Sequence, residues 1–244
     1  MIIAEVGLNH MGDSLKLKKI VNELCKTEID GITLQVREQS FYRKGNWKNF
    51  LLKDNVYKEI AMYVKNKGKI FGMALSDIDK IEFFSKFSDF FKILSKDIKN
   101  EKILKAFNET KKTCFLSTGN SDNEEINNAI NILDNCKLIH TRLDNSVNNV
   151  NLKAILSMKR HFLKPIAFGN HCEHHEVLFS AVTFQPSDYF FYVKDISDNT
   201  LPPDNLHAIE IKNVNYFSKK IKLLKNAIGD GKKQKTKNSI KGQI

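Results

Sequence analysis

The 244-residue chain has only four cysteines, and they lie far apart without a CxxC pair. This spacing excludes a dense disulfide framework and favours reduced thiols in a cytoplasmic protein. No segment approaches the roughly 18 uninterrupted apolar residues of a membrane helix. The N-terminus also lacks the basic start and apolar stretch of a signal peptide. We therefore expect a soluble cytoplasmic protein with no membrane partner.

Acidic residues are too few to balance the basic ones, so the formal net charge is +11. Such a charge suits an anionic partner, such as nucleic acid, a membrane surface or a phosphorylated metabolite. Lysine and asparagine are abundant throughout, however, and a coding bias toward AT-rich codons explains the charge equally well. The one concentrated basic run, GKKQKTKNSIKG at residues 231–242, has no interleaved aromatic residue. We predict a flexible basic tail over residues 231–244 and no nucleic-acid partner.

Short apolar runs alternate with longer segments of helical periodicity from one end of the chain to the other. The runs are continuously apolar, as expected of strands covered on both faces. They lie at residues 2–7, 31–36, 69–75, 90–95, 113–118, 137–141, 165–169 and 189–194. The candidate helices lie at residues 14–25, 54–67, 77–87, 99–111, 122–133, 150–161, 174–184 and 213–227, with Ser14 as the N-cap of the first.

Eight strand–helix units indicate a parallel α/β architecture, and eight is the number of strands that closes a barrel. A doubly wound open sheet is the rival, but no GxGxxG turn follows the first strand. We predict a single (β/α)8 TIM-type barrel over residues 1–230.

In such a barrel the chemistry is carried at the C-terminal ends of the strands. Here most of these ends are polar, which is typical of a pocket for a phosphorylated or carboxylated substrate. The ends carry, in chain order, Glu5 with Asn9 and His10; Gln35 with Arg37; Asp77; Lys92, Ser95 and Asp97; Ser117 and Thr118; His140 and Thr141; Asn170 and His171; and Lys194.

The seventh strand runs into GNHCEHH at residues 169–175, which holds three histidines, a cysteine and a glutamate. These are ligand types of zinc sites, and they are also ordinary surface residues. On its own the stretch is equally compatible with a metal site, an acid/base site or a polar loop.

Several stretches resemble the sialic acid synthase family, and they occur in order along nearly the whole chain. The opening and the LSTG strand are specific when taken together. The similar stretches are IIAEVGLNHMGD (2–13), DGITLQV (30–36), FFKILSKDIKN (90–100), FLSTGNSDNEEI (115–126), LIHTRLDNSVNNVNLKAI (138–155) and AIGDGKKQKT (227–236).

The resemblance implies condensation of phosphoenolpyruvate with an N-acetylated amino sugar, giving a nonulosonic acid and phosphate for surface glycan biosynthesis. It also implies a divalent metal, Mn²⁺ or Mg²⁺, held by two histidines, and it leaves a homodimer as one arrangement of the subunits. The residues that match the family's positions are Glu5, Asp97 and His171 as catalytic groups, and Asn9, Gln35, Lys92, Ser95, Ser117 and Asn151 as substrate-binding groups. His171 best matches one metal-binding histidine of the family, with His174 as its rival, and both are candidate metal ligands.

The chain departs from the family at several of these positions. Thr33 stands where the second strand should carry a lysine, and the second metal-binding histidine is missing near Tyr192. We also expect the protein to lack the small antifreeze-like domain that most members of the family carry.

Three interpretations stay open. The first is an active synthase with a new cation site, built from His171 with His174 or His175 and from Glu173 or Glu5. The second is a related condensation on a different sugar. The third is a non-catalytic or partner-dependent relative, in which the histidine-rich loop holds no metal.

Overall fold

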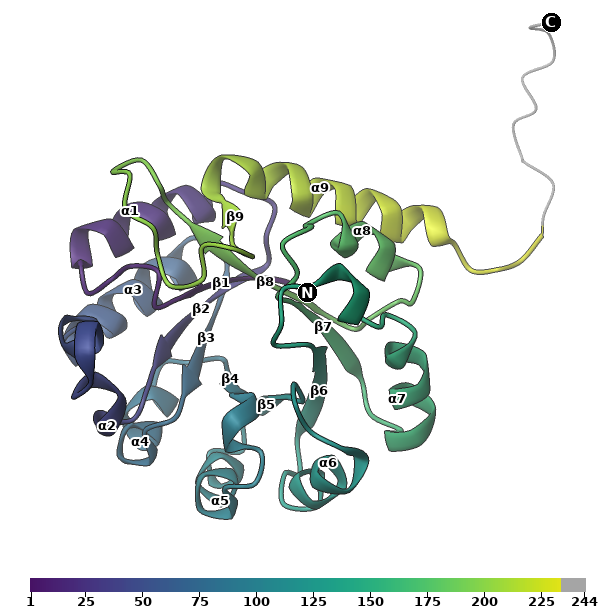
Figure 1. Cartoon of the computed structure of the whole chain (residues 1–244), viewed down its shortest axis with the longest axis horizontal. Coiled ribbons are helices and arrows are strands. Elements are labelled where there is room, and N and C mark those ends of the chain that lie inside the picture. The colour runs from purple at the N-terminus through teal and green to yellow at the C-terminus, as the bar shows by residue number, and fades with distance from the viewer. Residues whose placement is uncertain (234–244) are drawn as a thin grey trace, which may run out of the picture.

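Eight short buried strands form a closed parallel barrel in the computed structural model, which describes residues 1–233 (Figure 1). Each strand pairs with the next along the chain, and β1 also pairs with β8, which closes the barrel. The predicted (β/α)8 barrel is therefore confirmed. The strands are β1 (Ile2–Gly7), β2 (Gly31–Val36), β3 (Ile70–Leu75), β4 (Phe90–Ile93), β5 (Thr113–Ser117), β6 (Cys136–Thr141), β7 (Ile166–Asn170) and β8 (Tyr189–Lys194).

The helices surround the strands, and each predicted helix is present with bounds that differ by at most a few residues (Figure 1). Besides short 3-10 helices, the structure has one α-helix and one strand that were not predicted: the single-turn helix α2 and the two-residue strand β9 (Ile209–Glu210), which pairs with the end of β8. The helices are α1 (Ser14–Cys25), α2 (Gln39–Tyr42), α3 (Asp54–Asn66), α4 (Ile81–Ser85), α5 (Glu101–Glu109), α6 (Asn123–Ile130), α7 (Ala154–Phe162), α8 (Val177–Val182) and α9 (Ile211–Ile228).

The predicted N-cap of α1 is wrong by one residue. Asp13, not Ser14, caps the helix, because the Asp13 Oδ1 atom accepts hydrogen bonds from the backbone N–H groups of Leu15 (2.7 Å) and Lys16 (3.1 Å). An N-cap carboxylate also favours the positive end of the helix dipole.

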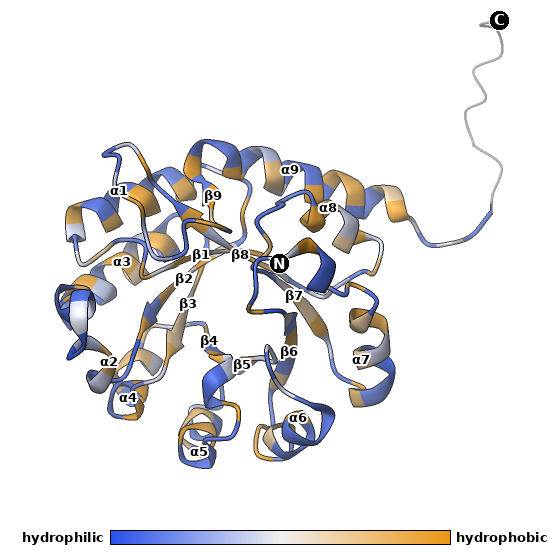
Figure 2. Cartoon of the chain, in the orientation of Figure 1, coloured by the Kyte–Doolittle hydropathy of each residue, from blue (hydrophilic) through white to orange (hydrophobic). Residues whose placement is uncertain are grey.

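Each helix buries one stripe of apolar residues, and Figure 2 shows the resulting mixture of hydrophobic and hydrophilic residues along the helices. In α1, Leu17, Ile20, Val21 and Leu24 are fully buried against the barrel. They recur at the spacing of one helix face, while most of the lysines of α1 lie outside the core. Amphipathic helices of this kind cover the outer surface of the strands and leave the interior of the barrel to the strand residues that point inward.

An apolar plug fills the N-terminal half of the barrel interior. Ile3, Phe90, Phe115, Ile139, Ala167 and Phe190 form this separate buried cluster. The three phenylalanine rings meet edge to face, with centroids 5.0–6.3 Å apart. Gly72 makes room for them, since a Cβ atom there would lie 2.3 Å from the Phe90 ring. The plug closes one end of the barrel with close-packed side chains.

The segment between β8 and β9 returns to the C-terminal end of the barrel, which we call the barrel mouth. Lys16 of α1 fixes the outer part of this segment, because its Nζ atom binds Asp198 Oδ2 at 3.0 Å and Thr200 Oγ1 at 2.7 Å. Asn9 fixes the inner part, since its Oδ1 atom accepts a hydrogen bond from the backbone N–H of Asp204 (3.1 Å). The segment thus brings residues beyond the last barrel strand to the mouth.

All four cysteines are free thiols, as expected. Within residues 1–233, none of the helices combines the length and the apolar character that crossing a bilayer requires. The predicted basic tail falls largely on residues 234–244, which lie outside the described part of the chain.

Candidate active site at the barrel mouth

A polar layer lies directly above the apolar plug, because side chains of one strand point inward at every second residue. On four strands, the residue two positions after a member of the plug is polar. These pairs are Ile3 and Glu5, Phe90 and Lys92, Phe115 and Ser117, and Phe190 and Tyr192. Each of these four polar residues is at most 6% exposed. The residues that point into the barrel therefore change from apolar in the plug to polar at the barrel mouth.

Lys92 and Glu5 form an ion pair across the barrel interior, between Nζ and Oε2. Their side chains are 4% and 3% exposed, so neither charge has ready access to bulk water. The Lys92 ammonium also lies 5.4 Å from the centroid of the Tyr192 ring, a distance at which a cation is attracted to an aromatic face. A buried cation is thus fixed at the centre of the mouth.

Two hydroxyl groups lie beside this pair, at the ends of β4 and β5. The Oγ atoms of Ser95 and Ser117 are 2.8 Å apart and share a hydrogen bond. Gly119 leaves room for them, because a Cβ atom there would lie 3.0 Å from Ser95 Oγ. Paired hydroxyls next to a lysine are suited to holding a phosphate or a carboxylate.

Asp97 is buried at the end of β4, with 4% exposure. The Ser76 hydroxyl donates a hydrogen bond to its Oδ2 atom, and the Lys96 ammonium lies 2.7 Å from its Oδ1 atom. Both carboxylate oxygens therefore have a partner within the protein.

Two histidines from different loops meet beside Tyr192. His171 follows β7, and His207 comes from the segment between β8 and β9. Their rings are stacked with centroids 4.7 Å apart and an interplanar angle of 26°. Tyr192 contacts both rings edge-on, at 5.3 Å from His171 and 5.1 Å from His207. This aromatic group forms the β7–β8 side of the mouth.

Burial keeps both imidazoles neutral. Desolvation lowers the pKa of His207 to about 4, and the positive charge of Lys92 acts in the same direction. Desolvation is also the main reason that the pKa of His171 lies well below its usual value, and His207 and Lys92 contribute further. The Nε2 atom of His207 is buried without a hydrogen-bond partner, although Asp204 Oδ1 lies 3.7 Å away.

Asp204 is a second carboxyl group on the Glu5 side of the mouth. Its burial and, to a smaller extent, the nearby negative charge of Glu5 together raise its pKa to about 7, against the opposing effect of Lys92. The Asp204 carboxyl therefore holds a proton over much of the range up to neutral pH. A carboxyl group with this pKa can act as an acid or as a base near pH 7.

Asn9 positions this group and the end of β8. The side chain is fully buried; its Nδ2 atom donates to the Val193 carbonyl oxygen (2.8 Å) and its Oδ1 atom accepts from the Asp204 backbone. Its amide is thus engaged with the backbone.

Three of the other predicted site residues lie in different surroundings. Gln35 is 9% exposed at the end of β2, on the rim of the mouth. His174 has a 59% exposed side chain, and its nearest acidic partner is its neighbour Glu173, at 3.7 Å. The structure thus brings Glu5, Lys92, Ser95, Ser117 and His171 to one region, whereas His174 faces the solvent.

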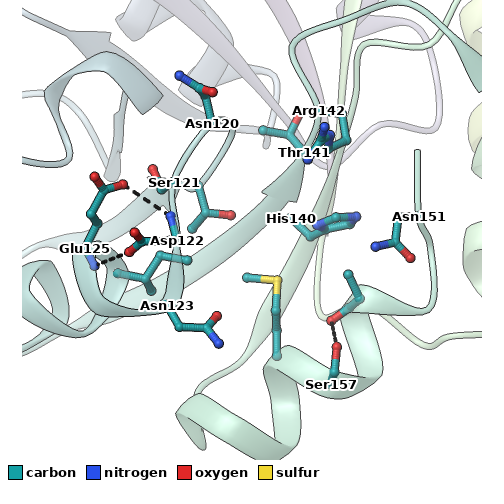
Figure 3. Close-up of a pocket in the computed structure, with 14 residues that line it drawn as sticks. Asn120, Ser121, Asp122, Asn123, Glu125, His140, Thr141, Arg142, Asn151 and Ser157 are labelled. Atoms are coloured by element: carbon teal, nitrogen blue, oxygen red, sulfur yellow. Dashed lines mark hydrogen bonds between the residues drawn. The ribbon is translucent and has the colours of Figure 1, made fainter. Parts of the chain in front are cut away.

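The third, Asn151, lines a cavity of about 530 Å³ between the loops that follow β5 and β6 (Figure 3). Arg142 and His140 lie on the same side, and Asn120 stands at the opposite loop (Figure 3). Asp122 and Glu125 also line it, but each accepts a hydrogen bond from the backbone N–H of the other in a capping box at the start of α6. The lining does not include Lys92, Ser95 or Ser117.

The metal implied by the sequence resemblance does not find a complete set of ligands. Within residues 1–233, no three or more His, Cys, Asp or Glu side chains are grouped so as to hold an ion. Glu5 is paired with Lys92, and the imidazole of His171 stacks on that of His207. We therefore derive no catalytic step through a metal.

Sequence reasoning missed Asp204 and His207. Both lie after the last barrel strand, in a segment without helical or strand periodicity. The only available signal was the acidic and imidazole side chains three residues apart in PPDNLH.

The chain is similar to several known proteins in sequence and in fold. The sequence model of the NeuB family matches residues 16–233. An N,N'-diacetyllegionaminic acid synthase from Campylobacter jejuni is 25% identical over 99% of this chain and 81% of its own length. The crystal structure of an N-acetylneuraminic acid synthetase from Leptospira borgpetersenii matches with a TM-score of 0.89 at 22% identity, over 97% of this chain and 87% of that one. A spore coat polysaccharide biosynthesis protein from Bacillus subtilis matches with a TM-score of 0.83 at 18% identity, over 93% of this chain and 68% of that one.

Proposed function

The chain belongs to the NeuB family, and on that premise we propose that it condenses phosphoenolpyruvate with an N-acetylated amino sugar. The product would be a sialic acid-like nonulosonic acid for surface glycan biosynthesis. The likeness to a legionaminic acid synthase and to a sialic acid synthetase supports an enzyme of this class. The observation that carries the proposal is the buried Lys92–Glu5 pair beside the Ser95 and Ser117 hydroxyls.

The proposed reaction forms one carbon–carbon bond and breaks one bond to phosphate. The C3 atom of phosphoenolpyruvate attacks the aldehyde carbon of the open-chain sugar, and the aldehyde oxygen takes up a proton. Water adds at C2 of phosphoenolpyruvate and loses a proton, and the C2–O bond to phosphate then breaks to leave the keto acid. One water is consumed and one phosphate is released.

Each step makes a demand that a residue at the mouth can meet. The Lys92 ammonium and the hydroxyls of Ser95 and Ser117 bind the phosphate and carboxylate of the donor. Gln35 on the rim, and Asn151 from the neighbouring cavity, add amide contacts to the bound substrates.

The carboxyl groups handle protons and sugar hydroxyls. Glu5 and Asp97 face the sugar, and the protonated Asp204 carboxyl, anchored through Asn9, supplies the proton to the aldehyde oxygen. His171 packs beside the reacting aldehyde as a neutral imidazole. We place the reaction in the cytoplasm, in keeping with the four free thiols.

The test is phosphate release by the purified protein with phosphoenolpyruvate and a panel of amino sugars that includes N-acetylmannosamine and 6-deoxy bacillosamine-type sugars. Lys92→Met should abolish release. Lys137→Met is the control, because Lys137 is likewise a lysine paired with a buried carboxylate, but it is partly exposed and lies at the closed end of the barrel. Folded protein that releases no phosphate with any acceptor, with or without added Mn²⁺, would rule the proposal out.

A second candidate function is binding without turnover. Thr33 replaces the lysine that the family resemblance places on β2, so one donor-side cation is missing. This candidate predicts that calorimetry detects phosphoenolpyruvate binding and that no acceptor gives phosphate.

A further inference from the structure

The family resemblance puts the second metal-binding histidine near Tyr192 or Val193 on β8, and of these two Tyr192 lies beside Lys92 and His171. It lies directly opposite Glu5 in the register of β1 and β8, so its side chain belongs to the polar layer of the barrel. Its ring packs closely against the first turn of the barrel, because a Cβ atom on Gly7 would lie 2.7 Å from Tyr192 Cε1. A phenol ring thus fills the space next to His171.

The Lys92 ammonium is already a cation at this point. It pairs with Glu5 and lies within 6 Å of the ring centroids of Tyr192 and Phe190. Of the two carboxyl groups at the mouth, Glu5 is paired with Lys92, and Asp204 holds a proton over much of the range up to neutral pH, so neither offers a free negative charge to a metal ion there. A divalent ion placed beside His171 would be repelled by Lys92 in a buried, weakly screened environment.

The two histidines do not point at a common centre. A metal ligand binds through a lone pair in the plane of its imidazole, and two such nitrogens must approach one ion to about 2.0–2.1 Å. The rings of His171 and His207 are instead stacked face to face, so their in-plane lone pairs run side by side. Tyr192 contacts both rings edge-on and holds the stack in place.

We propose that Tyr192 closes the metal site, so that this barrel holds no divalent metal at His171. The Lys92 ammonium, seated against Tyr192, then supplies the fixed positive charge of the mouth and holds the donor, while the Asp204 carboxyl activates the sugar aldehyde without a metal. The catalytic part of this inference rests on the proposed function, whereas the metal-binding part does not. The stacked histidines then serve as an uncharged aromatic wall that orients Tyr192.

The metal-binding part is tested by titrating the dialysed protein with Mn²⁺, following free Mn²⁺ by electron paramagnetic resonance, and with Co²⁺, following its visible absorption. The wild type and Tyr192→Phe should bind neither ion stoichiometrically at about 1 mM, which is the weak end of the dissociation constants of protein Ca²⁺ sites. Tyr192→His should gain one site, with Co²⁺ bands at least about tenfold stronger, and Tyr192→His/His171→Ala should lose it again.

Three results overturn the inference. The first is one equivalent of Mn²⁺ on the wild type that disappears in His171→Ala or His207→Ala. The second is a folded Tyr192→His variant that gains no site, because Tyr192 would then not be what closes it. The third is phosphate release by the wild type that EDTA abolishes and Mn²⁺ restores.

The outcome is separable from that of the proposed function. Absence of phosphate release under every condition defeats the proposed reaction and leaves the metal titrations to decide the metal-binding part. Release that is unchanged within about twofold by EDTA supports both.

Discussion

Two lysine–carboxylate pairs, each with a buried carboxylate, lie at opposite ends of the barrel interior, and they are built differently. At the closed end, Asp188 is paired with two cations: the amino group of Met1 at 2.9 Å and the Lys137 ammonium at 3.0 Å. At the mouth, the single lysine Lys92 has two carboxyl groups near it, Glu5 and Asp204. Both lysines also lie within 6 Å of a phenylalanine ring of the plug.

The two ends differ in the sign of the charge that is in excess. At the closed end, two cations surround one carboxylate, so positive charge is in excess. Burial alone would raise the pKa of Asp188, but hydrogen bonds and charge from the Met1 amino group and Lys137 outweigh it and lower that pKa. At the mouth the surplus is acidic, and the pKa of Asp204 rises to about 7. A carboxylate whose charge is fully balanced by cations contributes to stability, whereas a carboxyl group without its own cation keeps a proton that it can donate in a reaction.

The largest expected effect comes from removing the lysine at the mouth. Lys92→Met leaves Glu5 buried without a cation, so the free energy of unfolding should fall by about 3–5 kcal/mol. Phosphate release should fall by at least about 100-fold, because a preorganised positive group is lost. Urea denaturation and the phosphate assay measure the two effects.

Lys137→Met sharpens this contrast. Asp188 keeps the Met1 amino group, so this variant should lose less than half as much stability and retain its activity. Equal losses of stability and activity in the two variants would contradict the proposed difference between the two ends. The double variant Glu5→Gln/Lys92→Met should recover stability without recovering activity.

Asp204→Asn tests whether the carboxyl group of Asp204 keeps its proton in the folded protein. The folded protein holds a proton on Asp204 with a pKa of about 7, while in the unfolded chain the value is about 3.9. The folded state therefore binds more protons between about pH 4 and pH 7, and wild-type stability falls as the pH rises through this window. The asparagine variant should lack this fall, which amounts to a few kcal/mol, and its phosphate release should be much weaker near neutral pH.

Asp198→Asn, on the same segment, is the control. Hydrogen bonds from Thr200 and Lys16 lower the pKa of Asp198, so this substitution should leave the slope between pH 4 and pH 7 unchanged. Thermal unfolding followed by circular dichroism across the pH range gives both curves. Parallel curves for the wild type and Asp204→Asn would contradict the assignment.

A smaller effect is expected from Asn9→Ala. The substitution removes the hydrogen bonds to Val193 and Asp204 and leaves those backbone groups without partners, at a cost of about 1–3 kcal/mol. Asn66→Ala, at the exposed end of α3, should change stability by less than about 0.5 kcal/mol. Equal melting temperatures for the two variants would mean that Asn9 does not anchor the segment after β8.

The smallest effect is expected at the closed end. Asp188→Asn should cost about 1 kcal/mol near neutral pH, because Lys137 and the Met1 amino group both retain partial access to water. Since the folded pKa of Asp188 is lowered, its contribution is present above about pH 4 and is lost as the pH falls further. Acid titration of the melting temperature should therefore separate wild type and variant above pH 4 and bring them together below it.

The fold was predictable because its signals are local. The strands read as continuous apolar runs, and the alternation along them places Glu5 above Ile3 and Lys92 above Phe90 without any knowledge of tertiary structure. The elements that were missed, α2 and β9, are too short to show a period. The N-cap of α1 was misplaced by one residue because Asp13 and Ser14 are both good capping residues.

The site was only partly predictable because half of it depends on contacts between distant residues. His171 follows directly from its place at the end of a strand. The stacking of His207 on His171 and the position of Asp204 depend on how an irregular segment folds back over the mouth, and Asn9 fixes that path from the other end of the chain. No periodicity in the sequence encodes such a path.

The hydrogen bonds of Asn9 have a consequence for the order in which the protein is made. They join residues 184 and 195 positions apart, and β1 must likewise wait for β8. During synthesis the first strand therefore leaves the ribosome long before its closing partner exists, and such distant pairings are slow to form. The earliest residues made, Glu5 and Asn9, gain their role only when the loop carrying Asp204 has been translated, so an incomplete nascent chain can hold no working site.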